Sequence, residues 1–79
     1  MTSARIRIDG WRPGTKKVSL TDIILRSTDL GLAEAKSATD RILDGETVTL
    51  RLDVGADPDA TLAALDEAGV SASRARDGD

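Results

Sequence analysis

Two stretches of the chain alternate between apolar and polar residues, as expected for strands with one face buried and one face in water. In residues 4–9, Ile6 and Ile8 point to one side while charged residues point to the other. Residues 46–54 carry the strongest alternation and include several β-branched residues. The side chains expected to face the core from this second stretch are Val48, Leu50, Leu52 and Val54.

Three other stretches place apolar residues three or four positions apart, which is the spacing of an amphipathic helix. The first is predicted to begin at Ser19, whose hydroxyl can cap free backbone amides, and to end near Thr28. The second begins at Leu32 and ends before Gly45, which permits a left-handed C-cap. The third begins after Asp57 as N-cap and ends at the next glycine. The residues expected to face the core from these helices are Leu20, Ile23, Ile24 and Ser27, then Leu32, Ala35, Thr39, Ile42 and Leu43, and finally Leu62, Leu65 and Ala68.

A short strand over residues 70–74, with Val70 and Ala72 inward, completes the order strand, helix, helix, strand, helix, strand. The second and third strands flank a helical crossover and should run parallel, so the first strand can lie between them, antiparallel to both. We therefore expect an α+β fold of order β-α-α-β-α-β, in which a three-stranded antiparallel sheet carries three helices packed on one face. A single domain should span residues 1–79, with its ordered core over about residues 4–75.

The composition allows one small core and excludes several kinds of site. Leucine, isoleucine and valine together number eighteen, and Trp11 is the single aromatic residue. The chain has no cysteine, so it can form neither a disulfide framework nor a thiolate zinc site. It also has no histidine, the commonest general base and metal ligand. We therefore expect no metal, no cofactor and no enzymatic activity.

No apolar stretch approaches the roughly 20 residues that a membrane-spanning helix needs. The first residues do not have the pattern of a secretory signal peptide, and the absence of cysteine fits a reducing compartment. These features predict a cytoplasmic protein that does not contact a membrane.

The charge is distributed unevenly along the chain. Residues 1–21 contain five basic residues and one acidic residue, a balance of +4, whereas residues 22–79 contain six basic and thirteen acidic residues, a balance of −7. Such an asymmetry can steer a charged partner, but a solvated surface of mixed sign has the same composition.

Two short motifs in the helical region carry a family resemblance. Lys17-Val18 precedes the first predicted helix, and residues 30–36 read Leu-Gly-Leu-Ala-Glu-Ala-Lys. With these motifs the chain resembles, over about residues 5–74, the C-terminal domain of the bacterial ribosomal stalk protein L7/L12. Residues 65–70 also look like the last helix and strand of that family. The resemblance implies the β-α-α-β-α-β fold, which the ClpS adaptors of bacterial proteolysis share.

In the stalk-protein family the surface of the first two helices binds translation factors, so the resemblance implies a partner-binding surface there. The positions that keep the residue type of the family are Lys17, Val18, Gly31 and Lys36. Other positions depart from it: Thr21 and Asp22 stand where the family has an apolar residue and a lysine, and Leu25 stands where it has an arginine. These departures remove part of the family's basic stripe and imply a different partner.

We therefore predict a non-enzymatic module that binds a protein partner through its first two helices. Val18, Thr21 and Leu25 should form the apolar centre of the contact, with Lys17 and Lys36 at its charged rim. The resemblance implies a translation factor or another ribosome-related partner. The dimerisation segment of the stalk protein has no counterpart in these residues, and we expect a monomer.

Several of these residues have two possible roles. Leu25 can be an exposed contact or can pack at the edge of the core. Lys36 can bind an acidic partner or can pair with Asp40 or Asp29. Trp11, in a predicted loop, can be a secondary contact or can serve as a lid on a core that has no other aromatic residue.

Three other functions remain open at this point. A ClpS-like adaptor would need a carboxylate and polar groups beside an apolar pocket, and we find no such set in the sequence. Nucleic-acid binding by the sheet face that carries Arg5, Arg7 and Arg51 would need stacking aromatic residues, which this face lacks. A small enzyme would have to rely on carboxylates or lysine alone.

Overall fold

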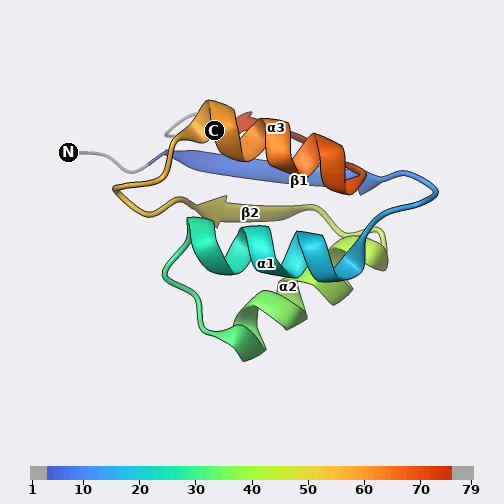
Figure 1. Cartoon of the computed structure of the whole chain (residues 1–79). Helices are drawn as coiled ribbons and strands as arrows, with labels where there is room; N and C mark the ends of the chain where they lie inside the picture. Colours follow the sequence, from blue (N-terminus) through green and yellow to red (C-terminus); the bar gives the residue numbers. More distant parts are fainter. Residues whose placement is uncertain (1–3, 76–79) are drawn as a thin grey trace.

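A computed structural model describes residues 4–75 of the chain, which fold as a sheet with helices on one face (Figure 1). The elements in chain order are β1 (Arg5–Trp11), α1 (Lys17–Ser27), α2 (Leu32–Leu43), β2 (Val48–Arg51), α3 (Pro58–Ala68) and β3 (Val70–Ala75). The predicted α+β class and the β-α-α-β-α-β order are confirmed.

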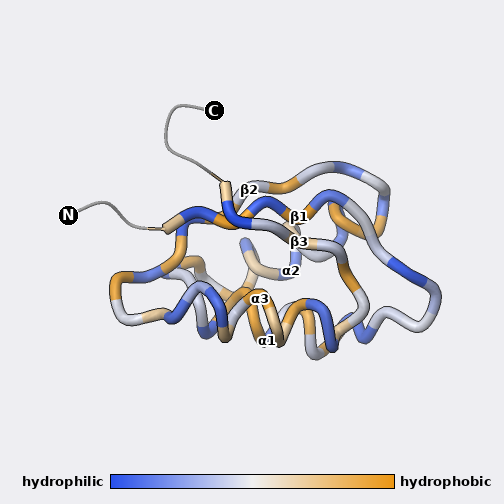
Figure 2. Tube along the Cα trace, turned by 90° about the horizontal axis from the view of Figure 1, so that it is seen from above, coloured by the Kyte–Doolittle hydropathy of each residue, from blue (hydrophilic) through white to orange (hydrophobic). Residues whose placement is uncertain are grey.

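The sheet has the strand order β2-β1-β3, with β1 antiparallel to both neighbours. Ile6 lies opposite Leu50 on one side, and Arg7 lies opposite Ser73 on the other. β2 and β3 therefore run in the same direction, as the crossover argument predicts. Figure 2 shows the strands in one layer and α1 and α3 in a second layer beneath them.

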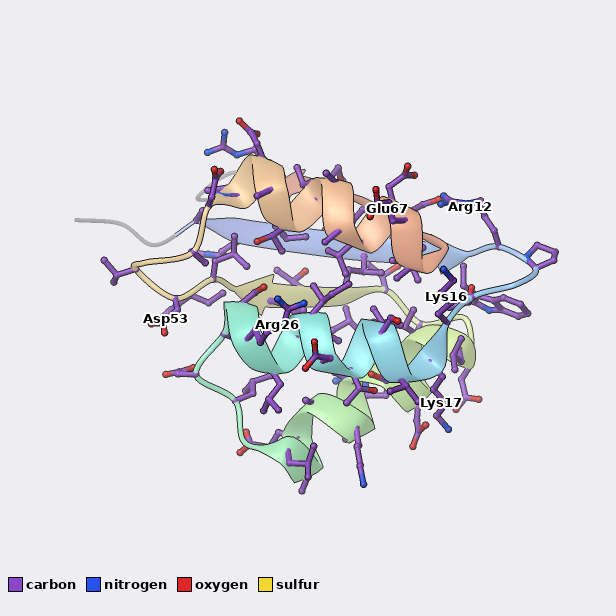
Figure 3. All side chains as sticks on the ribbon, in the orientation of Figure 1. Arg12, Lys16, Lys17, Arg26, Asp53 and Glu67 are labelled. Carbon is purple, nitrogen blue, oxygen red and sulfur yellow. The ribbon has the colours of Figure 1, made fainter. Side chains whose placement is uncertain are left out.

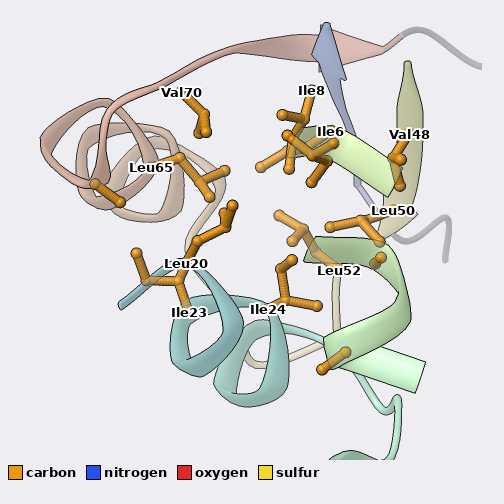
Figure 4. Close-up of a cluster of buried hydrophobic side chains, with 14 residues drawn as sticks. Ile6, Ile8, Leu20, Ile23, Ile24, Val48, Leu50, Leu52, Leu65 and Val70 are labelled. Atoms are coloured by element: carbon orange, nitrogen blue, oxygen red, sulfur yellow. The ribbon is translucent and has the colours of Figure 1, made fainter. Parts of the chain in front are cut away.

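The core lies between the sheet and the helices, and it consists of aliphatic side chains together with three buried threonines, Thr28, Thr39 and Thr61. Figure 4 shows Ile6 and Ile8 of β1 beside Val48 and Leu50 of β2, with α1 residues below them and Leu65 of α3 to the left. The buried hydrophobic residues are Ile6, Ile8, Leu20, Ile23, Ile24, Ala35, Ala38, Ile42, Val48, Leu50, Leu52, Leu65, Ala68 and Val70. Among these buried residues between positions 20 and 70, Ala38 is the one that the hydrophobic pattern did not predict to face the core. The pattern identified the others because apolar residues recur with the period of a helix or of a strand.

The predicted inward position of Val54 is wrong, because the second strand is shorter than its alternation indicates. β2 ends at Arg51, and the chain turns over residues 53–56, where Ala56 N–H donates to the carbonyl of Asp53 (2.9 Å). Beyond Leu52 the alternation of a strand no longer applies, and Val54 is 78% exposed.

The predicted inward position of Leu32 is also wrong. Leu32 is the first residue of α2, and 54% of its surface is exposed. The buried side of α2 is instead formed by Ala35, Ala38, Thr39 and Ile42. The other predicted core residues that prove to be only partly buried are Ser27, Leu43, Leu62 and Ala72. Leu62 and Ala72 still pack against the core.

The predicted start of α1 at Ser19 is wrong. The helix begins at Lys17 after Lys16, and no side chain caps it. The entry is held instead by tertiary contact, because Lys16 N–H donates to the carbonyl of Ala68 at the end of α3 (2.8 Å). The predicted cap of α3 is confirmed: Asp57 Oδ1 accepts from the backbone N–H of Asp59 (3.0 Å).

The first strand extends to Trp11, two residues beyond its predicted end, so Trp11 belongs to a strand and not to a loop. A register shift between Ile8 and Gly10 accompanies the extension. Such a bulge inserts one residue and moves the following side chain to the opposite face. Trp11 consequently lies opposite the buried Val70, on the helix side of the sheet.

The corner between α3 and β3 holds the segment that leads into α1. Gly69 has φ 101°, and a Cβ at this position would lie 2.9 Å from Thr15 Cα. The Gly69 carbonyl accepts from Arg12 N–H (2.8 Å) and from Thr15 Oγ1 (2.9 Å). Close backbone approach and a left-handed conformation both require glycine here.

We expect Gly69→Ala to destabilise the protein by about 2–3 kcal/mol, because a side chain at this position is strained and meets backbone atoms of Thr15. Gly55→Ala is the matched control, since Gly55 has open space around its Cα and no positive φ, and should change the free energy of unfolding by less than about 0.5 kcal/mol. Urea unfolding followed by circular dichroism measures both. Equal effects would contradict this account of the corner.

The two helix starts predict contrasting effects of removing a polar side chain. Asp57→Ala should cost about 1 kcal/mol of unfolding free energy, because it removes the acceptor for two amides of α3. Ser19→Ala should be nearly neutral, since Ser19 lies within α1 and not at its cap. The same unfolding measurement distinguishes them, and a larger loss for Ser19→Ala would mean that α1 begins later than Lys17.

Candidate functional site

A groove of about 460 Å³ runs between α1 and α2, and we call it the α1–α2 groove. All five residues predicted to form the main partner contact line it: Lys17, Val18, Thr21, Leu25 and Lys36. The structure adds three residues to this set, namely Asp22, Leu32 and Asp40. Helical spacing explains the grouping, because residues three or four positions apart share one face of each helix. Figure 3 shows Lys17 at the start of α1, on the side of α2.

The apolar part of the α1–α2 groove includes two strongly exposed side chains. Val18 is 84% exposed and Leu32 is 54% exposed, and they come from different helices. Leu25 is partly buried and packs against the core while also lining the groove. The two roles considered for Leu25 are therefore compatible, since one side of the residue packs inward and another borders the groove.

Two threonine hydroxyls connect the helices beside the groove. Thr21 Oγ1 lies 2.8 Å from Thr39 Oγ1, and Thr39 is fully buried. Thr21 Oγ1 also lies 3.0 Å from the carbonyl of Lys17, and Thr39 Oγ1 lies 3.0 Å from the carbonyl of Ala35. The prediction placed Thr21 in the apolar centre of the contact. In the structure its hydroxyl is instead a polar link between α1 and α2.

The charged rim differs from the prediction for Lys36. Lys17 Nζ lies 3.1 Å from Asp40 Oδ1, so this bridge joins the start of α1 to α2. Both side chains are more than half exposed, and such a pair stabilises by less than about 1 kcal/mol. The predicted alternative pairing of Lys36 with Asp40 or Asp29 is not found, because Lys36 makes no ion pair with any residue from 4 to 75.

Trp11 lies outside the α1–α2 groove. It is the last residue of β1 and lies opposite Val70, and 48% of its surface remains exposed. The indole is therefore only a partial cover at the end of the sheet, and its predicted role as a secondary contact stays a prediction.

Sequence reasoning missed Leu32 as a groove residue because the residue was assigned to the core. A signal for the correct assignment was present in the spacing. Leu32, Lys36 and Asp40 are separated by four residues each, and they form one stripe on α2. Because Lys36 and Asp40 are charged, this stripe is expected to face solvent, and Leu32 on the same stripe should face solvent as well.

Two kinds of site are not found in the part of the chain that the structure describes. Within residues 4–75, no three or more aspartate or glutamate side chains are grouped so that they could hold a metal ion. None of the helices in the same range has the length and the apolar run needed to cross a membrane.

Comparison of the chain with protein-family models, with curated proteins and with solved structures finds no match. The resemblance to the stalk protein therefore rests on the sequence motifs alone.

The link between Thr21 and Thr39 can be measured by a double-mutant cycle. Thr21→Val and Thr39→Val each replace a hydroxyl by a methyl group of similar size, and we expect a coupling energy of about 0.5–1 kcal/mol in urea unfolding.

Thr21→Val combined with Thr61→Val is the control cycle. Thr61 Oγ1 donates to the carbonyl of Asp57 within its own helical region and has no bond to Thr21. This second coupling should be close to zero. A similar coupling in both cycles would show that the hydroxyl contact between the helices contributes nothing specific.

Proposed function

We propose that this chain is a non-enzymatic protein-binding module whose partner docks in the α1–α2 groove. The observation that carries the proposal is the exposure of Val18 and Leu32 on facing helices, next to a lysine that has no ion pair among residues 4–75. Apolar side chains in a groove with a charged rim are the usual arrangement of a small protein–protein contact.

The groove residues define the chemistry of the partner. An apolar side chain of the partner would fill the space between Val18 and Leu32, and an acidic side chain would meet Lys36. Lys17 and Asp40 neutralise each other and would add little affinity. The link between Thr21 and Thr39 supports this role because it holds the two walls of the groove at a constant separation.

We further propose that the partner is related to translation or to the ribosome, and this part of the proposal is supported by the sequence resemblance alone. The cysteine-free composition agrees with a cytoplasmic setting, and we propose that the chain acts there as a monomer. The departures at Thr21, Asp22 and Leu25 support a partner different from that of the stalk protein.

Two exposed valines provide a sharp test of the proposed groove. Val18 is 84% exposed inside the groove, and Val54 is 78% exposed in the loop after β2. Affinity capture from the source cell, followed by mass spectrometry, would compare wild type, Val18→Asp and Val54→Asp. We expect Val18→Asp to lose the partner by at least about tenfold, because a charge would be buried in the contact, while Val54→Asp retains it.

Neither substitution should lower the unfolding free energy by more than about 0.5 kcal/mol, since both side chains are solvated. Retention of every bound protein by Val18→Asp would contradict the proposal. Chemical-shift changes confined to the outer sheet face on addition of the captured partner would contradict it as well.

A further inference from the structure

The backbone of β2 has one paired edge and one open edge. Within residues 4–75, β2 pairs with β1 and lies at the end of the sheet. Leu52 N–H donates to the carbonyl of Ala4 (2.8 Å), and these two residues continue the register between β1 and β2. In an antiparallel ladder, hydrogen-bonded pairs alternate with pairs whose backbone groups point away. Leu52 belongs to a hydrogen-bonded pair, so Thr49 and Arg51, at odd-numbered offsets from it, belong to the other kind of pair. Their N–H and C=O groups therefore point away from β1, toward the open edge.

A hollow of about 360 Å³ lies along β2, between this strand and α2, and we call it the α2–β2 groove. All of β2 lines one side, while Glu34, Ala38 and Arg41 line the other from α2. At about 100° per residue, these three positions lie roughly 140–160° around the helix from Lys36. The α2–β2 groove is therefore separate from the α1–α2 groove, and the two proposals can fail independently.

The floor of the α2–β2 groove is formed by apolar side chains that expose little of their own surface. Leu50 is 7% exposed and Ala38 is 6% exposed, and both line the groove. Ala38 has a small side chain and fills little of the hollow, which has a volume of about 360 Å³. A strand placed beside β2 would direct alternate side chains onto this floor.

The groove has two different ends, because α2 and β2 run in opposite directions around a tight turn. At one end, Glu46 N–H donates to the carbonyl of Arg41 (3.0 Å), which places the last turn of α2 beside the start of β2. At the other end, Asp53 N–H donates to the carbonyl of Ser27 (2.8 Å), which places the segment leading to α2 beside the end of β2.

The two ends also differ in charge. Asp29 and Glu34 line the end that lies beside the end of β2, and neither carboxylate forms an ion pair with a residue from 4 to 75. At the opposite end, Arg41 Nε lies 3.4 Å from Glu46 Oε1, so the charge of Arg41 is already compensated. Arg51, the last residue of β2, lines the same end as Asp29 and Glu34, so two negative charges and one positive charge leave a balance of −1 there. A positively charged side chain complements this end.

We propose that the α2–β2 groove binds an extended segment of a partner protein, which adds to the sheet as a strand antiparallel to β2. The segment would exchange backbone hydrogen bonds with Thr49 and Arg51, place an apolar side chain over Leu50 and Ala38, and place a lysine or arginine near Glu34. In the antiparallel direction, the basic residue precedes the apolar residue by two positions. Backbone pairing supplies affinity in this mode of recognition, and alternate side chains supply specificity.

A capped peptide with the sequence Thr-Lys-Thr-Val-Thr-Thr is the probe that tests this proposal. NMR titration of the ¹⁵N-labelled protein should shift the amide resonances of Thr49 and Arg51 most strongly and should slow their hydrogen exchange. Three outcomes would overturn the proposal: no shift at millimolar peptide, shifts confined to the α1–α2 groove, or the same shifts in the free protein as its own concentration rises. The last outcome would identify a second copy of this chain as the occupant of the edge.

A charge exchange tests the direction and the basic residue. Glu34→Lys should weaken binding of the lysine peptide about fivefold, and a peptide with glutamate in place of lysine should bind this variant better than wild type. Glu67→Lys, the same charge change on α3, should leave the affinity unchanged. Failure of the glutamate peptide to recover binding to Glu34→Lys would overturn the antiparallel placement.

Thr49→Pro tests the backbone contact. Proline is tolerated on an edge strand where the N–H faces outward, so the variant should retain its circular dichroism spectrum but lose peptide binding. If it does not fold, hydrogen exchange at Thr49 and Arg51 of the wild-type protein decides the point, since unchanged exchange under saturating peptide would contradict strand addition.

Discussion

The structure depends on the burial of β1 between its two neighbouring strands and beneath the helices. Ile6 and Ile8 have no exposed surface, and their strand is paired on both sides. A slip of one residue would turn these isoleucines toward water and would turn Arg5 and Arg7 toward the core. Burying an isoleucine contributes about 1.5–3 kcal/mol, whereas burying an unpaired charge is strongly unfavourable, so one register is selected. The other elements take their positions from this strand.

α2 is the element that connects the core with both proposed binding surfaces. Its buried side consists of Ala35, Ala38, Thr39 and Ile42, three of which are small. Small residues let the helix approach its neighbours closely, and the hydroxyl of Thr39 bonds to Thr21 of α1. The remaining sides of α2 border the α1–α2 groove and the α2–β2 groove. Because α2 is held by the core, the shape of each groove is set by packing and not by mobile loops.

The hydrophobic pattern was a good guide where an element continues and a poor one where it ends. The alternation through Val48, Leu50 and Leu52 is a direct consequence of the two-residue period of a strand, and these residues are buried. At Val54 the same pattern continues in the sequence, but the backbone has already turned. The prediction for Leu32 fails for a related reason, since the first three residues of α2 are exposed and its buried side begins at Ala35. Helix starts are equally context-dependent: the local cap at Asp57 was predictable, whereas the start of α1 at Lys17 depends on a contact with Ala68.

The order of the elements and the apolar face of each could be read from the hydrophobic pattern. The family resemblance pointed to positions 17, 18, 21, 25 and 36, and these residues line one groove. The order and the apolar faces follow from period and polarity, which are local, whereas the choice of binding surface came from the resemblance. Three other features could be seen only in the folded molecule. Leu32 lines the α1–α2 groove and not the core, Thr21 bonds to Thr39, and a second hollow lies along β2. Such features depend on the separation of elements that are distant in the chain, and packing of the whole core sets that separation.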